Sequence, residues 1–324
     1  MSPARGGYVL VSVLWVVAML TVVTLSYHHR ARLEVQAARY SLDTTQCRLA
    51  ARGAVERGLV ELQLMDLKAQ FDPIPEAALA PINYLGQDWA RPLDLYAAGG
   101  LLDPGEGFDE DVALVRIEDL ERRIDINTAP LEILENLPGL TRSALRAIHA
   151  RRTGVGDSGA SPGEGPVRFH DIAELRDLDD VDEAAWRGAG ETPGLRDLLA
   201  AFGDGRINVN TAPAGVLVRI PNVTEEDAET IVAWREGDDG APGTADDRPY
   251  TSWEQFASAT GLAGDAMQSL QRHCKFDSDF FKITGLATRR GGRIRAACSA
   301  VVRLPNGSGA PILLSWSEES LGSQ

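Results

Sequence analysis

The hydrophobic pattern is strongest near the N-terminus, where no charged residue interrupts the stretch from Tyr8 to Leu25. At a rise of 1.5 Å per residue, a helix of this length spans about 27 Å, close to the roughly 30 Å hydrocarbon core of a bilayer. A cleaved secretory signal has a shorter apolar core and a small-residue cleavage site after it, and neither is present before Tyr27. A buried helix is rarely so uniformly apolar. The pattern therefore predicts a membrane anchor over residues 8–26.

After the anchor the pattern becomes amphipathic without a helix-breaking residue. No proline occurs between Tyr27 and Gln70, and apolar side chains recur at steps of three and four residues. These positions are Leu33, Ala37, Tyr40, Thr44, Cys47, Ala51, Val55, Leu59, Leu62 and Met65. We therefore expect the anchor to continue as one long helix whose outer half packs on a soluble domain. Pro73 and Pro75 are predicted to end it.

Strand patterns lie on both sides of a long helical region. Residues 112–117 and 123–126 are rich in β-branched side chains and predict a hairpin. Three more strands are predicted near the end of the chain, at residues 280–288, 293–304 and 311–316, with glycine-rich turns between them. One long helix and five strands form an α+β unit, which a segment of helical pattern interrupts.

The interrupting segment contains an internal repeat with a shift of 83 residues. Arg123–Pro130 returns as Arg206–Pro213, and 12 of the 30 residues from Arg123 to Arg152 are identical at this shift. In each copy an Asn-Thr-Ala-Pro sequence is predicted to cap a first helix, and Thr141 or Thr224 a second. A further helix closes each copy, at residues 171–178 and 252–262, the latter starting with a capping box.

A helix, a short Pro-Gly hairpin and a second helix resemble the helix-hairpin-helix module, whose exposed hairpin amides bind DNA phosphates. DNA-binding members have two hairpin glycines. Here the first copy has only Gly139, the second has Asn222 in its place, and the acidic run Glu225–Asp227 follows. These residues favour two sterile-alpha-motif-like packages that act as scaffold. The alternative is a membrane-tethered DNA-binding protein, which predicts a basic face formed by Arg142, Arg146, Arg151 and Arg152.

Charge and motif content narrow the function classes. The net charge of −15 repels phosphate backbones, so nucleic acid is not an expected partner. The sequence has no nucleophile-elbow, zinc-protease or phosphate-loop motif. Of the 5 histidines, only His28 and His29 are close together, at the predicted membrane interface. We therefore expect no enzymatic activity.

One glycine-rich loop, residues 236–247, concentrates acidic side chains. Its four aspartates are Asp238, Asp239, Asp246 and Asp247. Flexible oxygen ligands at irregular spacing suit Ca²⁺, which takes six to eight of them, although the spacing is not that of an EF-hand. The same composition also suits a solvated loop without metal, and the residues alone leave both interpretations open.

The N-terminus resembles a class III prepilin signal, in which a peptidase cuts after a glycine and leaves the apolar helix attached. The short leader ends Arg5-Gly6-Gly7, which places the predicted cut between Gly7 and Tyr8. Most pilins and pseudopilins have glutamate at the fifth position after the cut, where this chain has Ser12. The lack of that glutamate, together with two Asn-Thr-Ala-Pro packages behind the anchor, resembles the general secretion pathway protein K family, minor pseudopilins of type II secretion systems.

This resemblance implies a fold class and a domain order. The fold is α+β: a transmembrane helix continues into a long pilin-type helix packed on an antiparallel sheet, interrupted by an all-α insertion of two helix-hairpin-helix or SAM-like repeats. The predicted boundaries are a prepilin leader at 1–7, the anchor at 8–26, a first pilin-type part at 27–126, the insertion at 127–276 with repeats at 127–200 and 206–274, and final strands at 277–318.

The resemblance also implies partners and a location. They are minor pseudopilins I and J in a complex at the pseudopilus tip, other pseudopilins, the prepilin peptidase and the inner membrane, with the soluble part in the periplasm. Arg30, Arg32 and Arg39 beyond the anchor disagree with the positive-inside rule, so this orientation rests on the resemblance. Calcium is known in the family, which keeps Ca²⁺ as a candidate ligand of the aspartate loop beside the solvated loop without metal. If one disulfide forms outside the cytosol, Cys274 and Cys298 are the expected pair, because Cys47 lies on the long helix.

Overall fold

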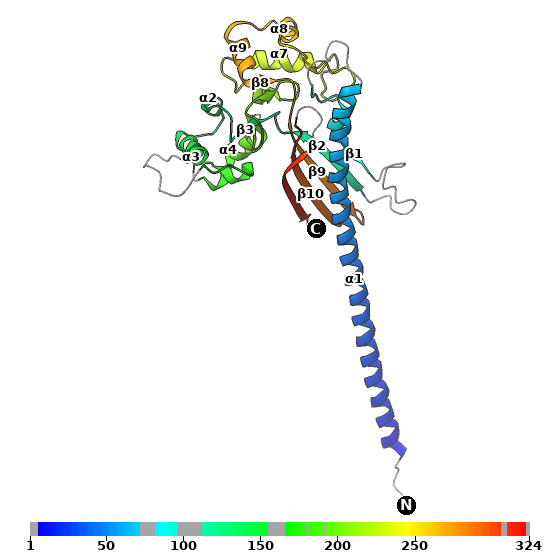
Figure 1. Ribbon diagram of the computed structural model, residues 1–324. Coiled ribbons are helices and arrows are strands. Elements are labelled where there is room, and N and C mark those ends of the chain that lie inside the picture. The colour runs from blue at the N-terminus through cyan, green and yellow to red at the C-terminus, as the bar shows by residue number, and fades with distance from the viewer. Residues whose placement is uncertain are drawn as a thin grey trace, which may run out of the picture.

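The computed structural model describes residues 6–71, 82–95, 112–154, 166–178, 180–190, 192–305 and 310–321. A long helix projects from a head made of one sheet and a group of short helices, and the N-terminal end of that helix lies far from the head (Figure 1). The prediction of a long N-terminal helix on an antiparallel sheet is confirmed.

The long helix, α1, runs from Gly6 to Phe71 without a break. Its 66 residues correspond to about 99 Å at 1.5 Å per residue. The absence of proline keeps the hydrogen-bond ladder intact over the whole length. The described helix ends directly before the segment in which Pro73 and Pro75 occur, and those two prolines lie outside the described residues.

The sheet has five antiparallel strands in the order β1-β2-β9-β10-β11. Their bounds are Leu93–Asp94, Val112–Asp119, Phe280–Arg289, Ile294–Arg303 and Ile312–Leu321. A short 3-10 helix, η1 (Asp88–Ala90), precedes β1. The turn between β9 and β10 has positive φ angles at Arg290, Gly291 and Gly292, which explains its two glycines. The three strands predicted near the end of the chain are therefore present.

Two glycines allow α1 to lie flush on this sheet. A Cβ atom at Gly285 of β9 would lie 2.1 Å from the carbonyl oxygen of Ala51, and one at Gly58 would lie 2.4 Å from Cγ2 of Ile283. The helix face between them is therefore in close contact with the strands. The core around it consists of small and branched side chains, including Cys47, Ala54, Val55, Leu62, Ile117, Phe281, Ile283, Ala296, Cys298 and Val302.

The predicted hairpin between residues 112–117 and 123–126 is wrong. β2 pairs with β1 and β9, whereas β3 (Ile124–Asp125) pairs in parallel with β6 (Leu199–Ala200). A turn at Leu120, whose amide bonds the carbonyl of Phe280, takes the chain out of the sheet before β3 begins. Ile124 of β3 and Ile126, which follows it, are buried in the core of the helical part instead.

The two copies of the repeat have parallel layouts and share one continuous core. The first consists of β3, α2 (Leu131–Leu134), α3 (Arg142–Thr153), η2 (Ile172–Asp177), α4 (Glu183–Arg187), β4 (Gly188–Ala189), β5 (Thr192–Pro193), α5 (Leu195–Leu198) and β6. The second consists of β7 (Ile207–Asn208), α6 (Ala214–Leu217), α7 (Glu225–Arg235), α8 (Trp253–Thr260), α9 (Gly264–His273) and β8 (Cys274–Lys275). β7 pairs in parallel with β8, as β3 does with β6, so each copy closes on its own beginning.

The predicted caps are partly correct. Thr141, Thr224 and Ser252 accept hydrogen bonds from amides of the first turns of α3, α7 and α8. The Asn-Thr pair does not cap the first helix, because α2 and α6 start after prolines without a side-chain cap.

The asparagine of each copy bonds distant backbone instead. Asn127 donates to the carbonyls of Phe169 and Ala201 and accepts from the amide of Phe169. Asn210 does the same with Tyr250 and Phe276.

Candidate functional site: the exposed anchor and the head

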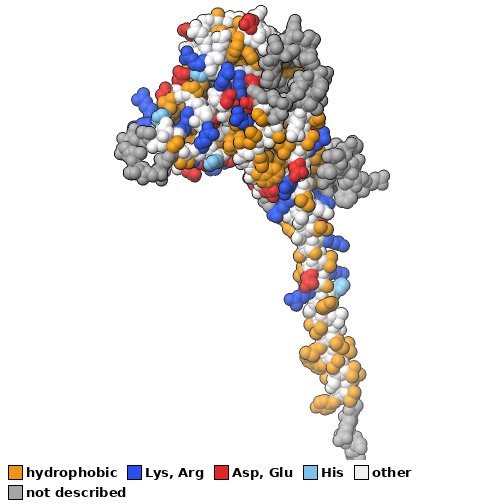
Figure 2. Space-filling view, in the orientation of Figure 1, with side chains coloured by type: hydrophobic (Ala, Val, Ile, Leu, Met, Phe, Trp, Pro, Cys, Tyr) orange, Lys and Arg blue, Asp and Glu red, His pale blue; other side chains and the backbone are white. Residues whose placement is uncertain are grey.

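The free half of α1 exposes apolar side chains over its whole circumference. Every residue from Tyr8 to Arg30 is exposed, and hydrophobic atoms cover the far end of the shaft (Figure 2). Within the described residues, α1 is the one helix long and apolar enough to cross a membrane, and none of its most apolar window is buried in the protein. A core helix of a soluble domain would be covered, so this surface needs lipid or apolar partner helices around it.

The predicted processing residues lie at the tip of this helix. Gly6 and Gly7 form its first turn, and the side chain of Tyr8 is exposed. The hydroxyl of Ser12 donates to the carbonyl oxygen of Tyr8 at 2.8 Å, so it is satisfied within the helix and adds no charge to the apolar surface. Residues 1–5 of the predicted leader lie outside the described residues, and the cleavage position stays a prediction.

A buried polar cluster joins the second copy of the repeat to the end of β2. The carboxylate of Asp119, which is buried, accepts from Thr211 Oγ1 at 2.5 Å, Ser278 Oγ at 2.7 Å and Asn208 Nδ2 at 3.3 Å. Burial raises the pKa of Asp119, and these hydrogen bonds oppose the shift. The donors come from both ends of the second copy, so this copy is fixed to the sheet at its entry and its exit.

A buried ion pair lies beside this cluster. Lys275 Nζ is 2.8 Å from Glu121 Oε2 and 2.9 Å from Asp204 Oδ2. The carboxylate of Glu121 also accepts from the amides of Asp204 and Asp279. Burial raises the pKa of Glu121 to about 8, although Lys275 opposes the shift. These residues were not predicted from the sequence, because Glu121 and Lys275 are far apart along the chain and a periodic pattern does not reveal a pair at that distance.

The aspartate loop is ordered by its own carboxylates. Asp246 accepts from the amides of Asp238 and Asp239 and from the hydroxyl of Thr244, and these bonds, that of Thr244 first, lower the pKa of Asp246 to about 2. Asp247 accepts from the amide of Gly243 at 2.9 Å, and Asp239 from that of Ala241 at 2.8 Å. Asp238 pairs with Arg248 at 2.7 Å.

The four carboxylates already accept from loop amides, from Arg248 or from Thr244, whose hydroxyl lies within 3.4 Å of Asp239, Asp246 and Asp247, so the loop as it stands is not a formed Ca²⁺ site. Among the described residues, no three acidic, histidine or cysteine side chains are grouped as ligands of one metal ion.

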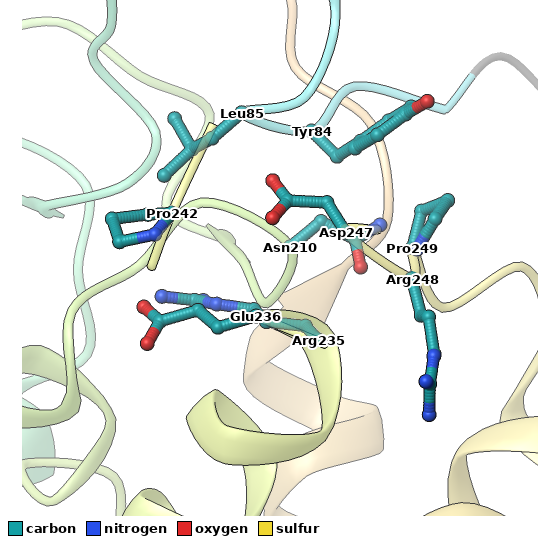
Figure 3. A pocket seen from close by; sticks show the side chains of 9 residues that line it. All are labelled: Tyr84, Leu85, Asn210, Arg235, Glu236, Pro242, Asp247, Arg248 and Pro249. Carbon is teal, nitrogen blue, oxygen red and sulfur yellow. The ribbon is translucent and has the colours of Figure 1, made fainter. Parts of the chain in front are cut away.

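This loop also contacts the segment that follows α1. A Cβ atom at Gly86 would lie 3.2 Å from both Cβ of Asp247 and the carbonyl oxygen of Thr244. Figure 3 shows Asp247 and Arg235 among the residues that line a small pocket here, with Tyr84 and Leu85 on the opposite side. Arg235 is buried, donates to the carbonyl of Val209 at 2.7 Å and has no hydrogen-bond partner for Nε; burial lowers its pKa to about 10.

The expected disulfide is not formed. All three cysteines, each among the described residues, are buried free thiols. Cys274 belongs to the core of the helical repeats and Cys298 to the core between α1 and the sheet, so the two lie in different cores. The Sγ atom of Cys47 lies 3.2 Å from the carbonyl oxygen of Ala287. The expectation paired these two because Cys47 lies on the long helix, but β8 and β10 belong to separate sheets.

The basic residues of the first copy do not form one free face. Arg151 pairs with Glu174 and lies 4.1 Å from the ring centroid of Phe169, and Arg152 donates to the carbonyl of Ala129. Two of the four arginines that the DNA-binding alternative requires are thus engaged inside the repeat. The DNA-binding alternative therefore lacks the continuous basic face that it predicts.

Comparisons with known proteins agree with this architecture. No family model matches the chain. Type II secretion system protein K of Pseudomonas aeruginosa is 28% identical over 262 residues, which cover 72% of this chain and 73% of that protein. The crystal structure of the GspK-GspI-GspJ complex from the enterotoxigenic Escherichia coli type 2 secretion system contains a chain with the same fold. It has a TM-score of 0.57 and 15% identity, and the match covers 87% of this chain and 99% of that one.

Proposed function

We propose that the chain is a member of the type II secretion system protein K family and acts as a minor pseudopilin of the pseudopilus tip, not as an enzyme. The observation that supports this most is that one chain combines an exposed apolar helix with a folded head, and that the match to the solved structure covers 87% of this chain and 99% of that one. Such a subunit acts by assembly: the anchor holds it in the membrane, and the head positions its neighbours.

The shape of the head favours a terminal place. The helical repeats extend to one side of α1 (Figure 1), and this bulk could not be repeated along a tightly packed filament. Ser12 also favours a terminal position in the filament. The glutamate that usually occupies this position pairs with the N-terminal amine of the next subunit, and a terminal subunit has no such neighbour. At the tip of the pseudopilus, the subunit would initiate pseudopilus assembly and in this way support protein export across the outer membrane.

The partners follow from the matched structure, which is a complex of GspK with GspI and GspJ. By analogy this chain binds the minor pseudopilins I and J of its own system and contacts other pseudopilins, after a prepilin peptidase has cut between Gly7 and Tyr8. The exposed apolar helix α1 and the similarity to protein K both indicate that the chain is anchored in a membrane. Its place as a single-pass inner-membrane protein with a periplasmic head is part of the proposal.

We also propose that the head consists of a pilin-type domain and an insertion of two helix-hairpin-helix or SAM-like repeats, with boundaries near those predicted. Two observations support this division. One core contains residues of α1 and the sheet, and the other contains residues from Ile124 to Cys274. The matched asparagines, Asn127 and Asn210, make equivalent hydrogen bonds in the two copies.

Calcium binding at Asp238, Asp239, Asp246 and Asp247 remains a proposal. Asp246 is held ionised by its hydrogen bonds, and the loop lies against the segment after α1, so a cation here would fasten the second copy to the pilin-type domain. At least one carboxylate must release a backbone amide to bind the ion, since Asp239, Asp246 and Asp247 all accept from amides of the loop.

Co-purification tests the assembly role. The full-length chain, extracted in mild detergent from cells that produce the candidate minor pseudopilins I and J, should bring both with it. Deletion of its gene should stop release of secreted proteins, and the full-length chain should restore it. Tight, steeply salt-dependent binding of duplex DNA without any pseudopilin partner would support the DNA-binding alternative instead.

A further inference from the structure

β11 forms a long open edge of the sheet. It pairs with β10 from Arg303↔Ile312 to Arg295↔Leu321, and it is last in the strand order. Among the described residues, no backbone hydrogen bond joins β11 to any segment other than β10. Alternate N–H and C=O groups of an edge strand point outward, so β11 offers a row of unpaired groups along a strand of 10 residues. The opposite edge differs, since β1 has only 2 residues.

The first half of this edge is apolar and uncovered. Ile312, Leu313 and Leu314 are 49%, 55% and 39% exposed. Leu313 pairs with Val302, which is buried on the side of the sheet that faces α1, but α1 packs mainly on β2, β9 and β10. Leu314 is the extra residue of a bulge, because Val301 pairs with Ser315 and Val302 with Leu313. Three consecutive large apolar side chains on a free edge indicate that another element covers them.

The second half of the edge is polar and acidic. Ser317, Glu318 and Glu319 are all exposed. The carboxylate of Glu318 accepts from Trp316 Nε1 at 2.9 Å, whereas Glu319 has no cationic partner among the described residues. The edge therefore has a direction: apolar at its start and negative toward its end.

This direction disfavours a second copy of the chain as the occupant. In the longest two-fold antiparallel pairing of β11 with itself, Leu314 would face Glu319 and Ser315 would face Glu318. A shift that overlaps the acidic ends would place Glu318 opposite Glu319, and like charges directly opposite each other destabilise a strand pair. A register that joins only the apolar ends would match Ile312 with Leu314, but it overlaps no more than three residues of a 10-residue strand. A different sequence therefore fits the whole edge better.

We propose that β11 is the docking edge for an extended strand of a neighbouring, non-identical pseudopilin, which lengthens the sheet by one strand. The docked strand presents apolar side chains to Ile312–Leu314 and a lysine or arginine to Glu319. Its backbone hydrogen bonds provide affinity, and the apolar-to-acidic direction sets the register. This inference rests on the proposed function and adds a contact surface to it.

The test uses the full-length chain in detergent with the co-produced minor pseudopilins I and J of its system. Leu314→Lys should weaken the complex about tenfold or more, because a charge replaces an apolar contact in the apolar half of the edge. Leu131→Lys is the matched control, since Leu131 is 40% exposed but lies on α2, and it should bind as the unmodified chain does. Glu319→Lys should weaken the complex as well.

Hydrogen exchange on the unmodified chain gives a readout that no folding defect can mimic. Amides of β11 should exchange about tenfold more slowly in the complex, while the amides of β9, already paired on both sides, should change little. If the complex forms but β11 exchanges as before, or if Leu314→Lys binds as tightly as Leu131→Lys, the inference is wrong and the proposed function stands. If the unmodified chain binds neither pseudopilin, the proposed function fails and the inference fails with it.

Discussion

Asn136 and Arg219 occupy the same position in the two copies of the repeat, and they bond each other. Asn136 Nδ2 donates to the carbonyl oxygen of Arg219 at 3.0 Å, and Arg219 Nη1 donates to the carbonyl oxygen of Asn136 at 3.1 Å. Reciprocal contact between equivalent residues is the mark of a local two-fold arrangement. The duplicated unit therefore packs against itself much as two subunits of a dimer do, which explains why both copies share one core.

Replacing the buried asparagine of a copy should destabilise the head. Asn210→Ala removes the partner of the Tyr250 amide and of two carbonyls in a buried site, so the expected cost is about 1–3 kcal/mol. Asn136→Ala, at an exposed position, should cost less than about 1 kcal/mol. Urea unfolding of the detergent-solubilised chain, followed by circular dichroism, measures both. Equal effects would contradict the structural role given to Asn210.

Alanine should have opposite effects on stability at a glycine of the helix–sheet contact and at a glycine on an open face of α1. Gly285→Ala places a methyl group against the backbone oxygen of Ala51, which cannot move aside alone, and should destabilise the head by about 1–3 kcal/mol. Gly53→Ala meets no atom within 4 Å and lies inside α1, so it should stabilise by about 0.5–1 kcal/mol. Thermal unfolding midpoints compare the two. Destabilisation by Gly53→Ala would mean that this helix face is covered.

Head stability should fall as pH rises from about 4.5 toward about 8. The folded chain raises the pKa of Glu121 to about 8, so it binds a proton that the unfolded chain has already released. The stabilisation is fully present below the unfolded pKa and is lost as pH passes the folded one, with a slope of at most about 1.4 kcal/mol per pH unit for one proton. Unfolding free energies measured in steps of about one pH unit, from about pH 5 to about pH 8, should show this slope. Glu121→Gln should flatten it, and an unchanged slope would point to Asp119 instead, whose pKa burial also raises.

Calcium should raise the melting temperature if the aspartate loop binds it. A ligand at a hundredfold excess over its Kd stabilises the folded state by about 2.7 kcal/mol. Melts in EDTA and in millimolar Ca²⁺ should therefore differ for the unmodified chain and coincide for the double variant Asp246→Ala, Asp247→Ala. Identical melting of the unmodified chain in both buffers would leave the loop as a solvated surface held by its own hydrogen bonds.

Processing should leave Tyr8 as the first residue. The exposed apolar surface of α1 starts at Tyr8, directly after Gly6 and Gly7. N-terminal sequencing of the membrane-extracted chain decides the point. A mature chain that starts after Tyr27 would instead indicate a conventional secretory signal and remove the anchor.

Features that depend on local pattern were predictable from the sequence. The uninterrupted α1, the strands β9 to β11 and the capping threonines Thr141 and Thr224 all follow from residues within a few positions of one another. Features that depend on distant partners were not. β3 looks like half of a hairpin until its parallel partner β6 is known, and nothing near Glu121 indicates Lys275. The expected bridge between Cys274 and Cys298 failed for the same reason, because order along the chain does not reveal which core a side chain enters.

The place where the helical repeats join the sheet has a consequence for how such a chain could arise. Asp119, where the sheet is left, and Phe281, just after it is re-entered, are partners in the register of β2 and β9. A tight turn of a few residues could connect these strands and leave every strand of the sheet in place. The sheet therefore tolerates inserted material of almost any length at this point, because both ends of the insert meet. A smaller ancestor without the helical repeats could have gained them here as one insertion, and the two copies could then have diverged. The surfaces of α1 and the sheet that contact neighbouring subunits would have stayed unchanged.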